Sequence, residues 1–196
     1  MFSQKKCSNK NCESNVIAET DYCLEHTDSR KEVTAQLIKE IINNEHFHSR
    51  NFSSIDFNEI NLSNKSFENC TFSHCCFNKT IFTGSFFSLT FFDFSIIEDV
   101  TFNDCNFRNV VFSGAKISNT DFSGSEIINS NFNGSEIDNS IFSDSDLYQS
   151  RFVNSNLCKL EFVDSNLKRT DFSCSDRKQI KFKYSNIEEA FFNKGQ

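Results

Sequence analysis

A large apolar residue occupies every fifth position from Phe52 to Phe192, with one exception at Arg177 and with no insertion that shifts the register. Most of these central positions hold Phe, and the others hold Ile or Leu. An α-helix repeats its face every 3.6 residues and a β-strand every two, so a period of five fits neither as a continuous element. The chain must therefore turn once in every repeat, which predicts a scaffold before it predicts any chemistry.

The residue two positions before each centre is usually small. In the second half of the chain this position holds Ala115, Thr120, Ser125, Ser130, Ser135, Ser140, Ser145, Ser150 and Ser155. Between the small and the large positions lie mostly Asn, Asp, Ser, Glu and Lys, which suit turns and solvent. We therefore expect small and large side chains to alternate along the inside of the fold.

This pattern resembles the pentapeptide-repeat family, whose consensus is a small residue, Asp or Asn, Leu or Phe, and two variable positions. The quintets TDFSG (residues 120–124), SNFNG (130–134) and SNLCK (155–159) follow it closely, and the resemblance covers about residues 50–194. The resemblance implies an all-β fold, a right-handed quadrilateral parallel β-helix of about seven coils. Each square coil would contain four quintets, with the central and the small residues pointing inward.

Four quintets per coil would stack residues that are twenty positions apart. The column from Phe52 to Phe192 then contains Phe without a break, and the facing column is Phe after its first member, Leu62. The other two columns begin at Phe57 and Phe67 and change to Ile or Leu in the later coils. This segregation into columns of twenty supports a four-sided coil independently of the resemblance.

Three cysteines and one histidine stand close together in residues 1–28, which lack the repeat. Cys7, Cys12, Cys23 and His26 have the spacing C-x4-C-x10-C-x2-H, with few apolar residues between them. Thiolate and imidazole ligands at short spacings suit tetrahedral Zn²⁺, whose binding free energy can replace missing apolar burial. The spacing also resembles that of small zinc-binding knuckles. We predict a structural zinc site in this segment, and the alternative is a flexible arm without metal.

Residues 29–49 are predicted to form an amphipathic helix and a linker. Ser29 followed by Glu32 is a capping-box pattern, and the helix is expected from about residue 30 to 44. Its apolar face holds Val33, Leu37, Ile38, Ile41 and Ile42. A β-helix exposes unpaired backbone and apolar core at its first coil, and an adjoining helix can cover that edge. We therefore expect this helix to be an N-terminal cap.

The C-terminal end of the repeat has no comparable helix. Phe191 and Phe192 lie close to the end of the sequence, so the last coil is expected to lie open or to pair with a second copy in a tail-to-tail homodimer. Arg177 is the one charged residue at a central position, and burying its charge is costly without a partner. We expect a local distortion to turn it outward, with a buried ion pair as the alternative.

The remaining cysteines predict a reducing environment. They are Cys70, Cys75, Cys76, Cys105, Cys158 and Cys174. Nine cysteines are an odd number, and Cys70, Cys75 and Cys105 fall at the small inward position, where free Cys acts as a small apolar residue. The sequence has no signal peptide and no long apolar run, which predicts a cytoplasmic protein without a membrane segment.

No pattern in the sequence indicates an enzyme. We find no Gly-rich phosphate loop and no histidine near a nucleophile with an orienting partner. The chain has five Gly and no Pro, and no long loop interrupts the repeats to build a catalytic cleft. We therefore predict a non-enzymatic protein.

Charge varies along the repeat, within a net charge of −7. An acidic band is expected to form a partner-binding surface, and it contains Asp93, Glu98, Asp99, Asp104, Asp121, Glu126, Glu136, Asp138, Asp144 and Asp146. From Arg151 to Lys183 the balance reverses, with eight Lys or Arg against four acidic residues. The band either binds a partner or only solvates the surface.

Three functions follow as hypotheses. The first is a protein-interaction scaffold that uses the outer wall. The second comes from the resemblance, because some family members are acidic mimics of duplex DNA that bind bacterial type II topoisomerases, DNA gyrase or topoisomerase IV, and protect them from quinolones. The third is a nucleic-acid-binding adaptor that uses the zinc segment and the basic coils, although the overall acidity disfavours direct nucleic-acid binding.

Overall fold

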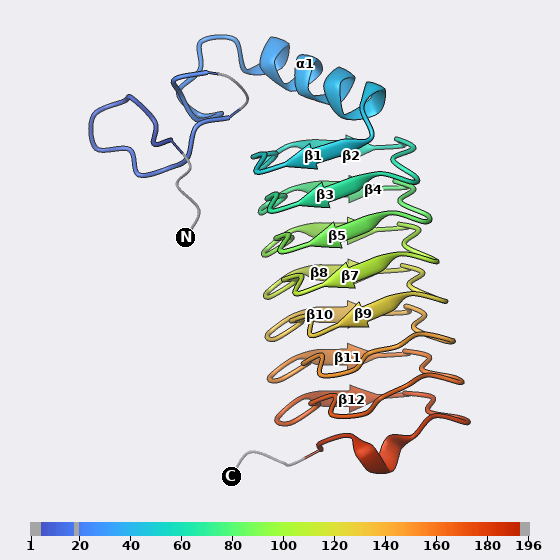
Figure 1. Ribbon diagram of the computed structural model, residues 1–196. Helices are drawn as coiled ribbons and strands as arrows, with labels where there is room; N and C mark the ends of the chain where they lie inside the picture. Colours follow the sequence, from blue (N-terminus) through green and yellow to red (C-terminus); the bar gives the residue numbers. More distant parts are fainter. Residues whose placement is uncertain (1–4, 18–19, 193–196) are drawn as a thin grey trace.

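A computed structural model of the chain describes residues 5–17 and 20–192, and it contains one long parallel β-helix with a helix at its N-terminal end (Figure 1). One face is a seven-stranded parallel sheet of β2 (Asp56–Asn58), β4 (Cys76–Asn78), β6 (Ile96–Glu98), β8 (Lys116–Ser118), β10 (Glu136–Asp138), β11 (Asn156–Cys158) and β12 (Asp176–Lys178). The opposite face is a five-stranded sheet of β1 (His46–His48), β3 (Ser66–Glu68), β5 (Phe86–Ser88), β7 (Asn106–Arg108) and β9 (Glu126–Ile128). We call these the seven-strand face and the five-strand face.

The two remaining sides are joined by single parallel bridges such as Asn51 with Thr71 and Asn61 with Ile81. We call them the Phe52 face and the Leu62 face, after the first central residue of each. Every strand pairing and bridge of the β-helix, within the described residues, joins residues that are twenty positions apart. The predicted fold class is therefore confirmed, and at twenty residues per coil the repeat makes about seven coils.

The inward columns form the core as predicted. Phe112, Phe132 and Phe152 are fully buried, and their rings stack in parallel with centroids 4.7 Å apart. Rings of the facing column meet them edge-on, as Phe122 does with Phe132 at 6.1 Å and 85°. Both arrangements are favourable geometries for aromatic pairs, and each pair adds about 0.5–1.5 kcal/mol beyond the burial of its area.

The small inward residues connect successive coils through hydrogen bonds. The Ser95 hydroxyl donates to the carbonyl of Phe72 at 2.7 Å and accepts the N–H of Cys75 at 3.1 Å. The thiol of Cys105 makes the equivalent bond and donates to the carbonyl of Phe82 at 3.0 Å. Burial raises the pKa of Cys70 to about 11 and that of Cys105 to about 12, so these thiols stay protonated and act as donors.

The N-terminal cap is helix α1 (Arg30–Asn43), which lies across the first coil (Figure 1). Leu37 and Ile41 are fully buried, whereas Ile42, which was expected on the apolar face, is exposed. The predicted capping box is also wrong, because the side chain of Ser29 makes no capping hydrogen bond. The helix is held by contacts with the coil below it.

Two basic residues fix α1 to the first coils, and neither was predicted to do so. Lys65 stands at a small inward position, where its Nζ donates to the carbonyls of Ile42 at 3.0 Å and Asn44 at 2.7 Å. These carbonyls lie at the C-terminal end of α1, which favours a cation. Burial lowers the pKa of Lys65. Arg50 pairs with Glu40 of α1 through both guanidinium nitrogens, at 2.7 and 2.9 Å.

The β-helix begins one quintet before the predicted boundary at residue 50. Phe47, in β1, is buried and stacks on Phe67 with ring centroids 5.1 Å apart. The predicted linker includes residues 45–49, because His46 and His48 on either side of this Phe lack the usual repeat composition. Both are exposed, so the strand keeps the inward Phe and presents its two histidines to solvent.

Arg177 does not turn outward, so that prediction is wrong. It stays in register with Leu157 in the seven-stranded sheet and is half-buried. Its Nη1 donates to the carbonyl of Phe172 at 2.7 Å and to Oγ of Ser175 at 2.9 Å, and the guanidinium lies 5.2 Å from the ring centroid of Phe192. Hydrogen bonds and a cation–π contact therefore compensate the charge at the last coil.

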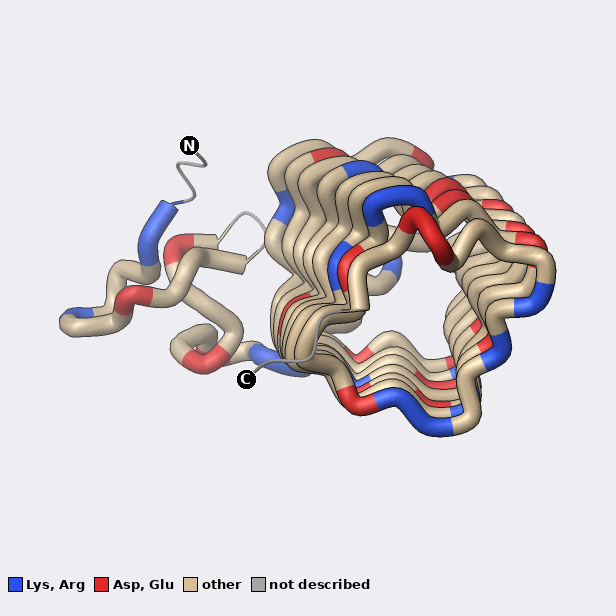
Figure 2. The backbone as a smooth tube through the Cα atoms, turned by 90° about the horizontal axis from the view of Figure 1, so that it is seen from below, with Lys and Arg blue, Asp and Glu red and all other residues tan. Residues whose placement is uncertain are grey.

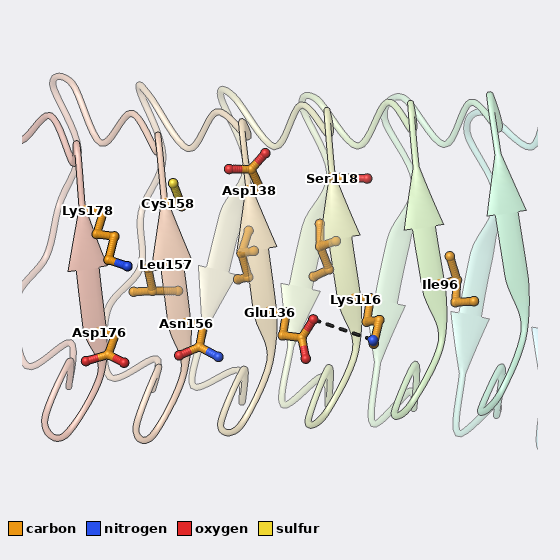
Figure 3. Close-up of a pocket in the computed structure, with 12 residues that line it drawn as sticks. Ile96, Lys116, Ser118, Glu136, Asp138, Asn156, Leu157, Cys158, Asp176 and Lys178 are labelled. Carbon is orange, nitrogen blue, oxygen red and sulfur yellow. Dashed lines mark ion pairs between the residues drawn. The ribbon is translucent and has the colours of Figure 1, made fainter.

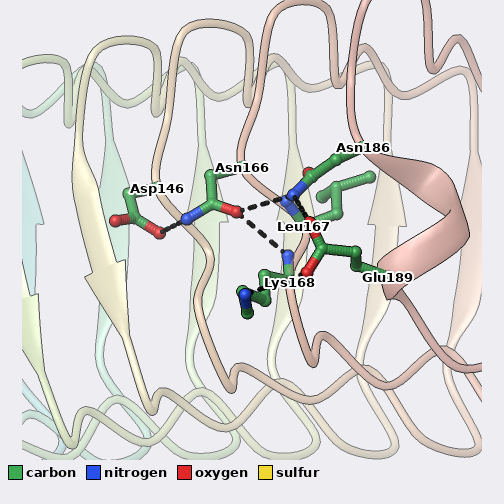
Figure 4. A network of polar contacts seen from close by, with 6 residues as sticks. All are labelled: Asp146, Asn166, Leu167, Lys168, Asn186 and Glu189. Carbon is green, nitrogen blue, oxygen red and sulfur yellow. Dashed lines mark hydrogen bonds and ion pairs between the residues drawn. The ribbon is translucent and has the colours of Figure 1, made fainter.

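The last coil ends in a short 3₁₀ helix, η1 (Ile187–Glu189), held by polar contacts (Figure 4). Asn186 donates to Asn166 at 3.0 Å, and Asn166 donates to Asp146 at 2.8 Å. Lys168 pairs with Glu189 at 3.1 Å, and this contact lowers the pKa of Glu189. The C-terminal end is therefore partly closed by η1.

Candidate metal centre and outer wall

The four predicted metal ligands are brought together by turns in the N-terminal segment. The N–H of Cys7 donates to the carbonyl of Ser14 at 2.9 Å, which joins two antiparallel stretches. Backbone bonds from Cys12 to Asn9 and from His26 to Cys23 close two tight turns. These turns direct the side chains of all four candidates toward one point.

The distances fit a tetrahedral metal site. Nδ1 of His26 lies 3.5 Å from Sγ of Cys7 and 3.3 Å from Sγ of Cys23, and the Sγ atoms of Cys12 and Cys23 are 3.8 Å apart. All four ligand atoms lie within 4.8 Å of one another. Zinc bonds of about 2.3 Å to sulfur and about 2.0 Å to nitrogen give tetrahedral edges of about 3.5–3.8 Å. The residues therefore lie close enough to hold a metal ion.

Backbone N–H groups favour ionised thiols in this cluster. The N–H of Ser14 lowers the pKa of Cys12. Burial opposes the ionisation of Cys7, but N–H groups of Cys23 and Asn9 outweigh it and lower its pKa. Burial dominates at Cys23 and raises its pKa. Ligating cysteines are deprotonated. A metal cation would therefore lower the thiol pKa values further at Cys7 and Cys12, and it would oppose the effect of burial at Cys23.

The segment that carries these four ligands, residues 5–17 and 20–28, packs beside the Phe52 face of the first coils. We call it the metal segment. Ile17 and Leu24 are buried and belong to the same apolar core as the β-helix. Nδ2 of Asn51 donates to the carbonyl of Val16 at 2.9 Å. The segment is therefore an ordered attachment to the rod.

The ten residues of the acidic band do not gather on one face. They are distributed around the rod, with Asp93 on the Phe52 face, Glu98, Asp99, Glu136 and Asp138 on the seven-strand face, Asp104, Asp121 and Asp144 on the Leu62 face, and Glu126 and Asp146 on the five-strand face. Figure 2, a view along the rod axis, shows acidic positions on every side of the coil. The band is a girdle around the middle coils.

Three members of this girdle are neutralised by basic neighbours. Arg108 pairs with Glu126 at 2.7 Å, Lys116 with Glu136 at 3.5 Å and Lys159 with Asp138 at 3.9 Å. Within residues 5–17 and 20–192, the other seven make no ion pair, namely Asp93, Glu98, Asp99, Asp104, Asp121, Asp144 and Asp146. We call these the unpaired carboxylates.

The basic residues of the late coils are partly used internally. Lys159, Lys168 and Lys181 pair with carboxylates, and Arg177 donates to the core backbone. The remaining basic residues of this stretch are Arg151, Arg169, Lys178 and Lys183. They are spread over all four faces, one on each, so the described part of the late coils has no concentrated basic surface.

A groove of about 500 Å³ runs along the seven-strand face (Figure 3). Its lining includes the pair of Lys116 and Glu136, and Cys158 beside Asp138. A hydrogen bond with Asp138 raises the pKa of Cys158, so this thiol is a poor nucleophile. The surface that lines the groove is mostly apolar, and charged side chains such as Lys116, Glu136 and Asp138 stand along it.

In the described part of the chain no helix is both long and apolar enough to span a membrane.

Two family models match the repeat. The model described as "Pentapeptide repeats (8 copies)" matches residues 51–88 and 105–144, and the model described as "Pentapeptide repeat region" matches residues 126–192. No curated protein is similar enough in sequence to count as a match.

Solved structures with a similar fold include a plasmid-mediated fluoroquinolone resistance protein, QnrB1. One trypsin-treated variant of it has a TM-score of 0.55 at 17% identity, covering 76% of this chain and 82% of that one. A second trypsin-treated variant has a TM-score of 0.52 at 14% identity, covering 76% and 80%. HetL from the cyanobacterium Nostoc, involved in heterocyst differentiation regulation, has a TM-score of 0.43 at 10% identity, covering 81% and 96%.

Proposed function

Since this chain belongs to the pentapeptide-repeat family, we propose that it is a non-enzymatic scaffold whose outer wall binds a protein partner. The observation that carries this proposal is the girdle of seven unpaired carboxylates around the middle coils. Internal ion pairs neutralise three neighbouring carboxylates but leave these seven, so the wall keeps a negative field. Such a field steers a basic partner surface toward the rod and selects against acidic ones.

Site-specific photocrosslinking tests this proposal. A photoreactive amino acid would replace one outward residue on each face in turn, for example Ser118, Ser123, Ser113 and Ser88. The variant would then be irradiated inside the cells that make the protein. We expect one discrete protein partner, captured from at least one face and competed by unlabelled wild-type protein. Failure of all four positions to capture a competable partner would refute the scaffold.

A more specific candidate is a DNA mimic that binds DNA gyrase or topoisomerase IV. Asp104, Asp144 and Asp164 occupy equivalent corner positions of the Leu62 face and make no ion pair within the described residues. Successive coils are about 4.8 Å apart, and Gly124 occupies the position between Asp104 and Asp144, so this corner is an interrupted row of negative charge along the rod. The similar fold of a fluoroquinolone resistance protein motivates the same idea.

A supercoiling assay separates this candidate from the general scaffold. DNA gyrase would be assayed with and without the protein and a fluoroquinolone, at several salt concentrations. A DNA mimic should inhibit or protect the enzyme at micromolar concentration, and salt should weaken the effect. If neither inhibition nor protection is seen, the mimic is excluded and the scaffold stands.

We propose that the bound metal is Zn²⁺ in a structural role. Three thiolates and one imidazole fill a tetrahedral shell and leave no open position for substrate. Metal analysis of the purified protein should find about one Zn²⁺ per chain. A variant with Cys7→Ser and Cys23→Ser should bind none, and retention of stoichiometric zinc would refute these ligands.

We also propose a tail-to-tail homodimer through the last coil. Phe191 is half exposed, and Phe192 is only partly buried beneath the last stacked ring. Light scattering across a wide concentration range should detect a dimer that a Phe191→Ser variant weakens. A monomer at every concentration would exclude it.

The cysteines are consistent with a cytoplasmic location, which we propose as well. None of the nine forms a disulfide, and this includes the neighbouring pair Cys75 and Cys76. Free thiols persist in reducing compartments. Fractionation of the native cells would locate the protein, and recovery from an oxidising compartment would contradict this assignment.

A further inference from the structure

One coil carries apolar side chains on its outside where the neighbouring coils are polar or small. Leu89 is 46% exposed, Phe94 60% and Ile96 49%. One coil later, the equivalent positions hold Asn109, Gly114 and Lys116. We call Leu89, Phe94 and Ile96 the apolar arc. Exposed apolar clusters of this kind mark contact surfaces on soluble proteins.

The backbone under the arc is not the one that these residues prefer. Leu89 and Phe94 occupy corner positions with φ of 50° and 56°. This left-handed conformation is common for Gly, Asn and Asp but strained for bulky side chains. Neither residue gains burial in exchange, so folding does not account for them. Strain without a folding benefit is typical of sites kept for binding.

The ring of Phe94 is fixed on the surface. It stacks on the ring of His74 with centroids 5.4 Å apart and an interplanar angle of 12°. On its other side lies Gly114, where an added Cβ would be 2.6 Å from Cε1 of Phe94. The imidazole and the bare glycine therefore hold the ring in one orientation. A preorganised side chain loses less conformational entropy on binding.

A cleft of about 310 Å³ leads to this ring from the N-terminal side. It lies between the metal segment, which contributes Ile17, Leu24 and Glu25, and the Phe52 face, which contributes Thr71 and His74. Figure 1 shows the N-terminal segment standing beside the first coils. His74 both lines the cleft and stacks on Phe94, so the cleft and the apolar arc adjoin at His74.

The charges around this surface are acidic and lack cationic partners. Asp93, Glu98 and Asp99 flank Phe94 and Ile96 in the sequence, and Glu25 lines the cleft. None of these four makes an ion pair within the described ranges. The basic residues of the adjacent coils are occupied, because Lys79 pairs with Glu59, Lys116 with Glu136 and Arg108 with Glu126. The surface is therefore complementary to a segment that is both apolar and basic.

We propose that the apolar arc and the cleft form one docking site for an extended segment of a protein partner, in which Leu or Phe side chains are flanked by Lys or Arg. The apolar side chains would cover Leu89, Phe94 and Ile96, and the basic ones would meet Asp93, Glu98 and Asp99. This inference rests on the proposed scaffold and names the chemistry of its partner.

Fluorescence anisotropy with defined peptides tests this site. The probe is a short labelled peptide that alternates Lys with Leu and Phe, and the comparison peptides carry Glu in place of Lys, or Ser in place of Leu and Phe. Only the first should bind. A Leu89→Asn, Phe94→Asn variant should lose about tenfold or more in affinity. Because Asn tolerates the left-handed conformation, the variant should melt at the same temperature or higher.

Ile141→Asn is the matched control, because Ile141 is an exposed apolar residue on the Leu62 face, away from the arc. It should leave peptide affinity unchanged. Equal binding by the arc variant, equal binding of the acidic peptide, or no binding of any peptide would overturn the inference. The crosslinking experiment keeps the two ideas apart: a partner captured from the wall equally by the arc variant refutes this site alone, whereas no captured partner refutes the scaffold.

Discussion

Lys65 departs from the repeat at the residue scale and stabilises the fold by doing so. A small side chain usually occupies this position of the repeat. Lys65, however, lies against the C-terminal end of α1 and not against another complete coil. The ammonium group reaches the carbonyls of Ile42 and Asn44, which no further helical turn can satisfy. One residue therefore joins the cap to the coil.

We predict that Lys65→Met destabilises the protein by about 2 kcal/mol, because two partly buried carbonyls lose a charged donor. Urea unfolding followed by circular dichroism would measure the change. Lys79→Met is the matched control, because Lys79 makes only an exposed pair with Glu59 and should contribute about 0.5 kcal/mol or less. Similar losses in the two variants would show that the bonds of Lys65 to α1 contribute nothing particular.

The cost of removing a ring should depend on its place in the column. Phe132 has stacked neighbours at 4.7 Å on both sides, so Phe132→Ala should cost about 3–5 kcal/mol. Phe192 stacks on one neighbour only and is partly exposed, so Phe192→Ala should cost about 1–2 kcal/mol. Chemical denaturation of both variants gives the comparison, and equal costs would argue against nearest-neighbour stacking as the source of stability.

At the scale of elements, the rod and the metal segment are held by different forces. The coils are stabilised by buried rings and by coil-to-coil hydrogen bonds, whereas the metal segment has little core of its own beyond Ile17 and Leu24. Removing the proposed Zn²⁺ with a chelator should therefore loosen residues 5–17 and 20–28 and leave the β-helix folded. Hydrogen exchange should rise in that segment only, and a rise throughout the coils would contradict this division.

The C-terminal helix η1 should respond to acid. The hydrogen bond from Lys168 and then that from Asn186 lower the pKa of Glu189. A lowered pKa in the folded state gives stability above the unfolded pKa of about 4.3, and this stability is lost as the pH falls through the folded value. Amide exchange at residues 187–190 should therefore increase below about pH 4. Glu189→Gln should remove this pH dependence, and the adjacent change Glu188→Gln should preserve it.

Much of the architecture can be predicted from the sequence, because it depends on short patterns that recur along the chain. The period of five and the columns of twenty identify the buried residues, and the short spacings of Cys7, Cys12, Cys23 and His26 identify a cluster that the turns bring together. Lys65 and Arg177 could not be predicted, because their partners are backbone carbonyls positioned by the fold. The distribution of the acidic residues over four faces likewise depends on coil geometry.

At the scale of the whole molecule, the rod combines a repetitive interior with outward side chains that differ from coil to coil. The core residues are nearly interchangeable from coil to coil, so the identity of the protein lies in its outward residues, in particular the seven unpaired carboxylates and the apolar arc. A rigid wall presents these groups at fixed spacing, which favours recognition of a partner without a costly rearrangement.

The most direct test of this account is the yield of partner crosslinking after two matched charge changes. One variant replaces the seven unpaired carboxylates with their amides, and the other replaces only the paired Glu126, Glu136 and Asp138. Amides preserve shape and hydrogen-bond acceptance, so both variants should fold. We predict that the first loses about tenfold or more in yield while the second stays close to wild type. Equal yields from both would contradict the claim that the unpaired carboxylates form the partner-binding wall.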